Sequence, residues 1–126
     1  MKPRILVVED DTISQKVFKY YLRGIYDLDI AGDPETAISY GLRNEYMAVL
    51  MDINLGTDLN GIDITRYFRE QEKTKGLYII ACTAFTFEES KSEFMKKGFD
   101  DFLGKPFQKE QIVNLMAELS EKKIVA

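Results

Sequence analysis

The sequence predicts an α/β fold in which helices cover a parallel β-sheet. Three short, continuous apolar runs indicate the sheet, because strands that are covered on both faces need no alternation of apolar and polar residues. These runs are Ile5–Val8, Met47–Met51 and Leu77–Cys82. Helical patterns separate them, so that strand and helix alternate five times along the chain. Such alternation indicates parallel strands joined by right-handed crossovers.

The first strand, Ile5–Val8, leads into a helix that we expect over Thr12–Arg23. Thr12 and Gln15 have the spacing of a capping box, in which two side chains cover free amides at a helix start. The stripe expected to be buried on this helix consists of Ile13, Val17 and Tyr20. A weaker strand candidate, Leu28–Ala31, follows.

The second helix is expected to begin at Asp33 and Pro34, since Asp is favoured as the N-cap and Pro at the first helical position. It should run to about Arg43. After the strand Met47–Met51, a third helix is expected over residues 61–71. Its marker residues are Ile64, Tyr67 and Phe68.

The strand Leu77–Cys82 precedes a fourth helix, which a capping box of Thr86 and Glu89 would begin and Gly98 would end. Asp101–Leu103 is the last strand candidate. Apolar residues at helical spacing predict the fifth helix, and they are Ile112, Leu115, Met116 and Leu119.

The composition fits one globular domain of 126 residues, with 45% hydrophobic and 30% charged residues. A net charge of -4 with interleaved signs argues against direct nucleic-acid binding, which needs a basic face. The amino terminus lacks a signal-peptide pattern, and no apolar run is long enough to span a membrane. The single Cys82 suits a reducing compartment. We therefore expect a cytoplasmic location without membrane contact.

The chain contains no histidine. This excludes Ser-His-Asp and Cys-His nucleophiles, imidazole acid–base chemistry and His-ligated zinc. The chain also cannot carry a phosphohistidine itself. Any catalysis must therefore use carboxylates, hydroxyls, lysines, backbone groups or a hard metal ion.

Polar side chains follow four of the five expected strands, at the edge where ligands bind in open α/β sheets. They are Glu9, Asp10, Asp11, Asp52, Asn54, Thr83 and Lys105. Most have an ordinary structural explanation when taken singly, such as a helix cap or a solvated lysine. Asp52 differs, because carboxylates are almost never fully buried unless they are paired. Its nearest expected neighbours are further carboxylates.

Carboxylates gathered at one edge repel one another. Two unit charges about 4 Å apart repel by roughly 4 kcal/mol at an effective dielectric constant of about 20. Lys105 alone could not cancel Glu9, Asp10 and Asp52, so either a carboxyl is protonated or a divalent cation binds. An all-oxygen site indicates Mg²⁺, Mn²⁺ or Ca²⁺, and room for water and phosphate oxygens favours Mg²⁺. A cation, a carboxylate nucleophile, a hydroxyl and a lysine together form a phosphoryl-transfer site.

Four motifs in the right order make the whole chain resemble the receiver domain of two-component response regulators, the CheY-like family. They are "ILVVED", "VLMDIN", "ACTA" and "GFDDFLGKPF". The resemblance implies a doubly wound, flavodoxin-like (βα)5 fold with strand order 2-1-3-4-5. The resemblance covers essentially the whole chain, which stops soon after the fifth helix, so we expect a single receiver domain over residues 1–126, without an output domain. The strand order would bring Glu9 and Asp10 beside Asp52.

The resemblance also implies a role for each acidic residue. Asp52 would accept the phosphoryl group. Asp10 would bind Mg²⁺, or Mn²⁺ in its place, together with Asp52 and the backbone carbonyl of Asn54. Glu9 would hold the ion through a water molecule.

The remaining site residues would bind the phosphoryl group and report it. Lys105 and Thr83 would each contact the group, and Pro106 occupies the position of the family's cis-proline. Phe102 sits at the family's aromatic switch position. Phosphorylation would draw Thr83 inward, let the Phe102 ring follow, and remodel the face formed by the fourth helix, fifth strand and fifth helix.

The partners implied are a histidine kinase or a histidine phosphotransfer protein as donor, and an unknown downstream protein. A phosphorylation-dependent dimer is a further outcome that the resemblance allows. The domain would be a switch rather than an enzyme, because it would take up and hydrolyse its own phosphoryl group without turning over an external substrate.

Two positions depart from the commonest family pattern. Leu55 and Gly56 replace a Met-Pro pair, and Gly61 lies nine rather than eight residues after Asp52, so this loop is one residue longer. Phe85 stands where a polar side chain could position attacking water. We hypothesise that it slows self-dephosphorylation.

Several alternatives stay open at this point. A small phosphohydrolase of the haloacid dehalogenase type also uses an Asp nucleophile with Mg²⁺, although Asn54 stands where its second Asp is usual. A flavodoxin-like cofactor carrier would need a glycine- and hydroxyl-rich phosphate loop where this chain has Glu9-Asp10-Asp11. The sequence could also be the receiver of a larger regulator or hybrid kinase.

Overall fold

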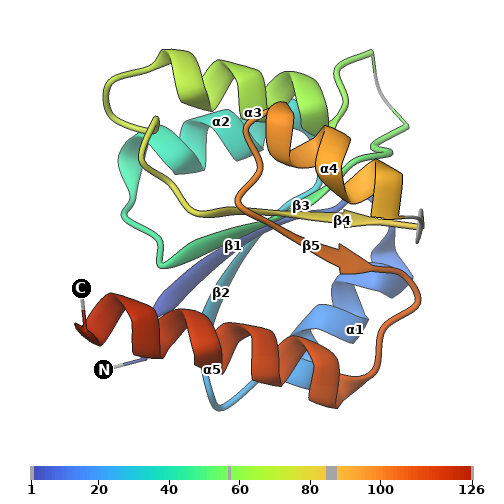
Figure 1. The fold of residues 1–126 in the computed structure, drawn as a ribbon, viewed down its shortest axis with the longest axis vertical. Coiled ribbons are helices and arrows are strands. Elements are labelled where there is room, and N and C mark those ends of the chain that lie inside the picture. Colours follow the sequence, from blue (N-terminus) through green and yellow to red (C-terminus); the bar gives the residue numbers. More distant parts are fainter. Residues whose placement is uncertain (1, 57, 85–87, 126) are drawn as a thin grey trace.

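The computed structural model describes residues 2–56, 58–84 and 88–125. Its sheet consists of five parallel strands in the order β2-β1-β3-β4-β5 (Figure 1). The strands are β1 Arg4–Val8, β2 Asp27–Ala31, β3 Ala48–Asp52, β4 Ile79–Thr83 and β5 Asp101–Gly104. The helices are α1 Thr12–Leu22, α2 Pro34–Arg43, α3 Gly61–Glu70, α4 Glu88–Lys96 and α5 Lys109–Val125. The predicted fold class and strand order are confirmed.

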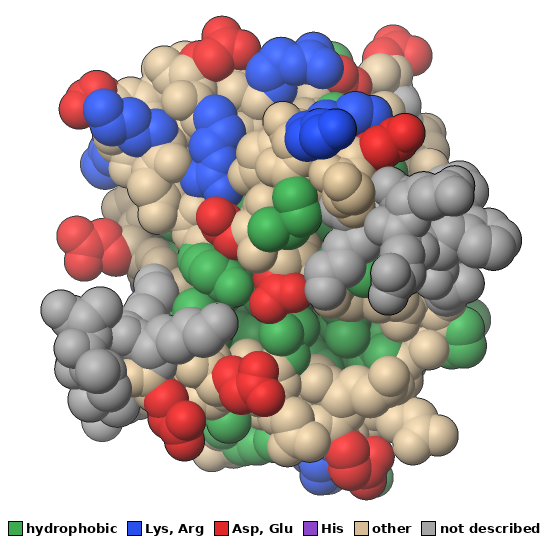
Figure 2. All heavy atoms as spheres, in the orientation of Figure 1, with side chains coloured by type: hydrophobic (Ala, Val, Ile, Leu, Met, Phe, Trp, Pro, Cys, Tyr) green, Lys and Arg blue, Asp and Glu red, His purple; other side chains and the backbone are tan. Residues whose placement is uncertain are grey.

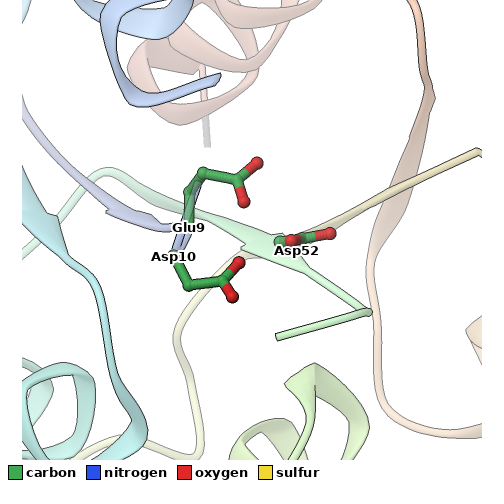
Figure 3. Close-up of side chains that lie close together, drawn as sticks. All are labelled: Glu9, Asp10 and Asp52. Carbon is green, nitrogen blue, oxygen red and sulfur yellow. The ribbon is translucent and has the colours of Figure 1, made fainter. Parts of the chain in front are cut away.

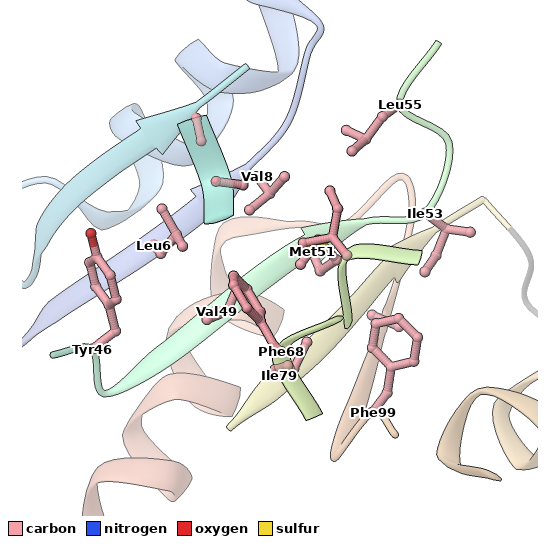
Figure 4. Close-up of a cluster of buried hydrophobic side chains, with 14 of the residues drawn as sticks. Leu6, Val8, Tyr46, Val49, Met51, Ile53, Leu55, Phe68, Ile79 and Phe99 are labelled. Carbon is pink, nitrogen blue, oxygen red and sulfur yellow. The ribbon is translucent and has the colours of Figure 1, made fainter. Parts of the chain in front are cut away.

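Helices cover both faces of this sheet, with α1 and α5 on one face and α2, α3 and α4 on the other (Figure 1). Successive residues of β1 point to opposite faces, so Leu6 packs in one core and Val7 in the other. Figure 4 shows the core that contains Leu6, in which Phe68 of α3 lies against β3 and β4. Because both faces are buried, the apolar runs within β1, β3 and β4 are continuous.

Helix α1 differs from its prediction in both its cap and its buried stripe. The N-cap is Asp11, whose carboxylate accepts a hydrogen bond from the amide of Ser14 at 2.8 Å. A carboxylate at this end of a helix also interacts favourably with the helix dipole. Thr12 is therefore already the first helical residue, and the predicted Thr12–Gln15 capping box is wrong.

The predicted α1 stripe is wrong because a different helical face meets the sheet. Ile13 and Tyr20 are 72% and 60% exposed. The buried residues are Phe18 and Leu22, which lie one turn apart and pack with β1 and α5. Several residues on different faces of α1 are apolar, so helical spacing alone does not identify the inward face.

The other helix boundaries follow clearer signals. Asp33 caps α2 as predicted, and its carboxylate accepts from the Thr36 amide at 2.8 Å. Gly98 follows α4 with a φ of +105°, a conformation that glycine adopts without strain. Thr86, half of the capping box predicted for α4, lies outside the described residues.

The strand register gathers the polar residues at one sheet edge. Val8 pairs with Met51, so Glu9 follows β1 next to Asp52 at the end of β3. Thr83 pairs with Gly104, which places Lys105 just beyond the neighbouring strand end. Within the described ranges, no helix is both long and apolar enough to cross a membrane.

Candidate functional site

Three carboxylates converge where β1 and β3 end (Figure 3). Glu9 and Asp10 follow β1, and Asp52 is the last residue of β3. One carboxylate oxygen from each lies within 4.8 Å of the other two. Glu9 and Asp52 are only 1% and 6% exposed, whereas Asp10 is open to solvent. The predicted cluster therefore forms, and one of its members remains accessible.

Lys105 supplies the positive charge nearest to this cluster among the ion pairs of the described residues. Its Nζ donates to a Glu9 carboxylate oxygen at 2.6 Å and lies 3.4 Å from Asp52 Oδ1. The Lys105 amide also donates to the Thr83 carbonyl at 2.7 Å, which fixes the lysine to the end of β4. The peptide bond between Lys105 and Pro106 is cis, as the resemblance implied.

The balance of charge in the cluster shifts two pKa values. Burial and the neighbouring Asp52 raise the pKa of the Glu9 carboxyl above its usual value, although Lys105 opposes the shift. Burial lowers the pKa of the Lys105 ammonium, but the hydrogen bond to Glu9 and the charge of Asp52 outweigh it and raise that pKa overall. One ammonium therefore leaves this buried negative charge incompletely compensated.

Hydrogen bonds with the backbone of neighbouring segments and with the Gln15 side chain hold Glu9 in position. Its amide donates to the Ala31 carbonyl of β2 at 3.0 Å, and its carbonyl accepts from Gln15 Nε2 at 2.6 Å. Its second carboxylate oxygen accepts from the Asp11 amide at 3.3 Å. The contact from Gln15 was missed at the sequence level, because a side chain six residues away carries no local pattern for it.

The loop after β3 approaches the cluster closely. The backbone amide of Asn54 donates a hydrogen bond to Asp52 Oδ1 at 3.3 Å. A Cβ at Gly61 would overlap the backbone carbonyl of Asp52, and one at Gly56 would lie 3.2 Å from Asp10 Oδ2. Leu55, only 1% exposed, anchors the loop in the core. Two glycines therefore let this longer loop pass against the site, and the role of the Asn54 carbonyl as a ligand stays a prediction.

The two predicted switch residues lie on neighbouring strands. Thr83, 1% exposed, ends β4, and Phe102 is half-buried in β5 beside Ala81. The Phe102 ring stacks on Phe94 of α4, with centroids 5.9 Å apart and an interplanar angle of 23°. Phe94 was missed at the sequence level. Phe85, the residue proposed to affect dephosphorylation, lies outside the described residues.

The donor set fits a hard divalent cation. The cluster offers only oxygen ligands, two of its carboxylates are largely buried, and the third is accessible to solvent. Mg²⁺ prefers one or two carboxylates and keeps several water ligands. Such an ion could relieve the repulsion that Lys105 leaves uncompensated.

Comparison with known proteins identifies the family. The model of the response regulator receiver domain matches residues 5–117. The transcriptional regulatory protein ResD of Bacillus subtilis is 35% identical over 112 residues, which cover 87% of this chain and 45% of ResD. A hybrid signal transduction histidine kinase of Dictyostelium discoideum is 36% identical over 112 residues, which cover 82% of this chain and 6% of that protein. The chain thus spans less than half the length of these relatives.

Solved structures agree with this assignment. The receiver domain of the sensor histidine kinase PA1611 from Pseudomonas aeruginosa, described with magnesium in its active site cleft, is 31% identical with a TM-score of 0.84. The match covers 94% of this chain and 98% of that one. CheY4 of Vibrio cholerae shows the same fold, with 22% identity and a TM-score of 0.85. That match covers 94% of this chain and 99% of CheY4. The chain belongs to the receiver domain family of two-component signalling systems, whose members are signalling switches.

Proposed function

We propose that Asp52 accepts a phosphoryl group, in the presence of Mg²⁺, from the phosphohistidine of a histidine kinase or phosphotransfer protein. The observation that carries this proposal is the buried Asp52 carboxylate, which lies with Glu9 and Asp10 in one cluster and 3.4 Å from the Lys105 ammonium. A carboxylate with a cation and a lysine beside it suits phosphoryl transfer, because that reaction needs positioning and charge neutralisation more than covalent chemistry.

The transfer exchanges one bond to phosphorus for another. A carboxylate oxygen of Asp52 forms the new bond as the phosphorus–nitrogen bond of the phosphohistidine breaks. The electron pair of the broken bond leaves with the imidazole, which then takes up a proton. Since these 126 residues contain no histidine, the phosphohistidine that donates the group must lie outside them.

Each neighbouring residue has a proposed task in this reaction. Asp10 and Asp52 would hold Mg²⁺ directly with the Asn54 carbonyl, and Glu9 would hold it through water. Bound Mg²⁺, for which Mn²⁺ could substitute, neutralises charge on the phosphoryl oxygens. Lys105 binds one of these oxygens, which requires it to loosen its 2.6 Å contact with Glu9.

We propose that Thr83 and Phe102 transmit phosphorylation of Asp52 to the protein surface by changing position. The Thr83 hydroxyl would bind the phosphoryl group, and Phe102 would change position with it. Figure 2 shows hydrophobic side chains gathered across the middle of the face on which α4, β5 and α5 lie, and this face suits a downstream protein or a second copy. In this proposal the domain turns over no external substrate.

Acetyl phosphate and intact-protein mass spectrometry test the proposal. With Mg²⁺, the protein should gain the mass of one phosphoryl group, and Asp52→Asn should abolish the gain. Asp11→Asn is the matched control, since Asn can also cap α1 and the gain should persist. A gain that survives in Asp52→Asn, or that does not depend on Mg²⁺, would contradict the proposal.

A further inference from the structure

Three phenylalanine rings connect α4 to β5. Phe94 of α4 is 7% exposed and Phe99, in the turn after α4, is 2% exposed. The Phe94 ring lies 5.9 Å from the Phe99 ring at 80°, an edge-to-face contact, and 5.9 Å from the Phe102 ring at 23°, a stacked contact. Phe94 therefore joins a fully buried ring to the half-buried ring of the proposed switch residue.

The carboxyl-terminal end of α4 is held firmly to the rest of the fold. Arg69 of α3 donates to the carbonyl of Gly98, just after α4, through Nε at 2.8 Å and Nη2 at 2.6 Å. It also donates to Leu77 O at 2.6 Å and to Asp100 Oδ2 at 2.8 Å. Asp100 Oδ2 in turn accepts from the Ile79 amide at 2.8 Å. These charge-assisted bonds tie the end of α4 to α3 and β4.

The opposite end of α4 begins at Glu88, five residues beyond Thr83. A helix that is held at one end can tilt at the other, and a ring contact near the held end would act close to the pivot. Stacked rings in a packed core move together or separate, because such cores have discrete arrangements rather than a continuous range.

We propose that Phe94 is a positioning residue that couples the Phe102 ring to α4, so that displacement of Phe102 tilts α4 about the end held by Arg69. This inference rests on the proposed function, in which Phe102 moves after phosphorylation of Asp52. It adds the contact through which that movement reaches the helix. If Phe94 only filled the core, its replacement would change the stability of the domain but would not weaken the response of α4 to a change at Asp52.

Beryllofluoride with Mg²⁺, which mimics the phosphoryl group, and amide NMR of the intact chain test the coupling. In the wild-type protein, the addition of beryllofluoride and Mg²⁺ should change the chemical shifts of the Asp52 and Thr83 amides and of the amides along α4. In Phe94→Leu, the shifts at the site should persist while those along α4 fall to less than half. Phe94→Met, which fills a similar volume with a flexible chain, should give the same result if the leucine variant does not fold.

Phe99→Leu is the matched control, because it removes the edge-to-face contact with Phe94 and leaves the stack on Phe102. Its α4 shifts should match those of the wild type. Full α4 shifts in a folded Phe94 variant would overturn the coupling while leaving the proposed function intact. Absence of any shift at Asp52 in the wild type would instead overturn the proposed function and the coupling with it.

Discussion

At the scale of single residues, the site depends on how closely charges and backbone groups approach one another. Lys105 contacts Glu9 at 2.6 Å and Asp52 at 3.4 Å, although these residues are far apart in the sequence. The residue types at the strand ends predicted the cluster. They did not predict that Lys105 contacts Glu9 more closely than Asp52, because that choice depends on burial and register.

Gly61 offers a test of close backbone approach. Gly61→Ala would place a methyl group against the Asp52 carbonyl, so we expect a loss in unfolding free energy on the order of 2 kcal/mol and weaker Mg²⁺ binding. Gly76→Ala is the control, because its Cβ would meet nothing within 4 Å and stability should stay within about 0.5 kcal/mol. Urea unfolding and calorimetry measure both effects. Equal stability of the two variants would argue against the close approach.

Tyr78 offers a test that depends on pH. Burial and the nearby Asp101 carboxylate raise the pKa of Tyr78 to about 12. Since the folded protein holds this proton more tightly than the unfolded chain, the stabilisation is complete below about pH 10 and is lost as pH rises through about 12. Ultraviolet titration should show a tyrosine that ionises near pH 12 and is lost in Tyr78→Phe. Tyr46 should still ionise late in that variant, because burial and its hydrogen bond to Asp29 raise its pKa as well.

Asp101→Asn separates the two causes of that shift. The Tyr78 hydroxyl donates to Asp101 at 3.3 Å, so removal of the charge should lower the Tyr78 pKa without returning it to 10. An unchanged titration curve in Asp101→Asn would show that burial alone accounts for the shift.

At the scale of elements, continuous apolar runs were the most informative signal. They located β1, β3 and β4, because strands buried on both faces cannot alternate. Helix α1 was harder to interpret, since exposed Ile13 and Tyr20 looked like core residues. The start of α3 was placed correctly at Gly61, but its cap was missed: Asn60 accepts from the amides of Ile62 and Asp63 at 2.9 and 3.1 Å.

The Asn60 cap predicts a measurable loss of stability. Asn60→Ala removes both hydrogen bonds at the start of α3 and should lower the unfolding free energy by about 1 kcal/mol. Asn60→Ser keeps an acceptor oxygen and should retain most of the stability. Chemical denaturation of the two variants measures the difference, and equal losses would mean that the cap contributes little.

At the scale of the whole molecule, strand order decides which residues meet. The repeated strand–helix pattern predicted a parallel sheet, but the order 2-1-3-4-5 came from the family resemblance. Periodicity cannot predict the order of the strands in the sheet, because a local sequence pattern identifies a strand but carries no information about its neighbours. Placing β1 between β2 and β3 brings Glu9 and Asp10 to Asp52 and leaves the ends of β4 and β5 to supply Thr83 and Lys105.

Mg²⁺ should stabilise the whole domain through this cluster. Because an ion that binds only the folded state adds to stability, each tenfold rise in Mg²⁺ above its Kd should add about 1.4 kcal/mol. Thermal unfolding across a Mg²⁺ series measures this, and Asp10→Asn should remove most of the dependence. A Tm in the variant that rises as in the wild type would place the ion elsewhere.

Chemical mapping identifies the residue that carries the phosphoryl group, which we propose is Asp52. Borohydride reduces an aspartyl phosphate to homoserine, which peptide mass spectrometry can locate in the chain. After treatment with acetyl phosphate and Mg²⁺, we predict homoserine at position 52, and none in a sample without the metal. Homoserine at position 10 or 11 instead, or at no position, would show that Asp52 is not the phosphoacceptor.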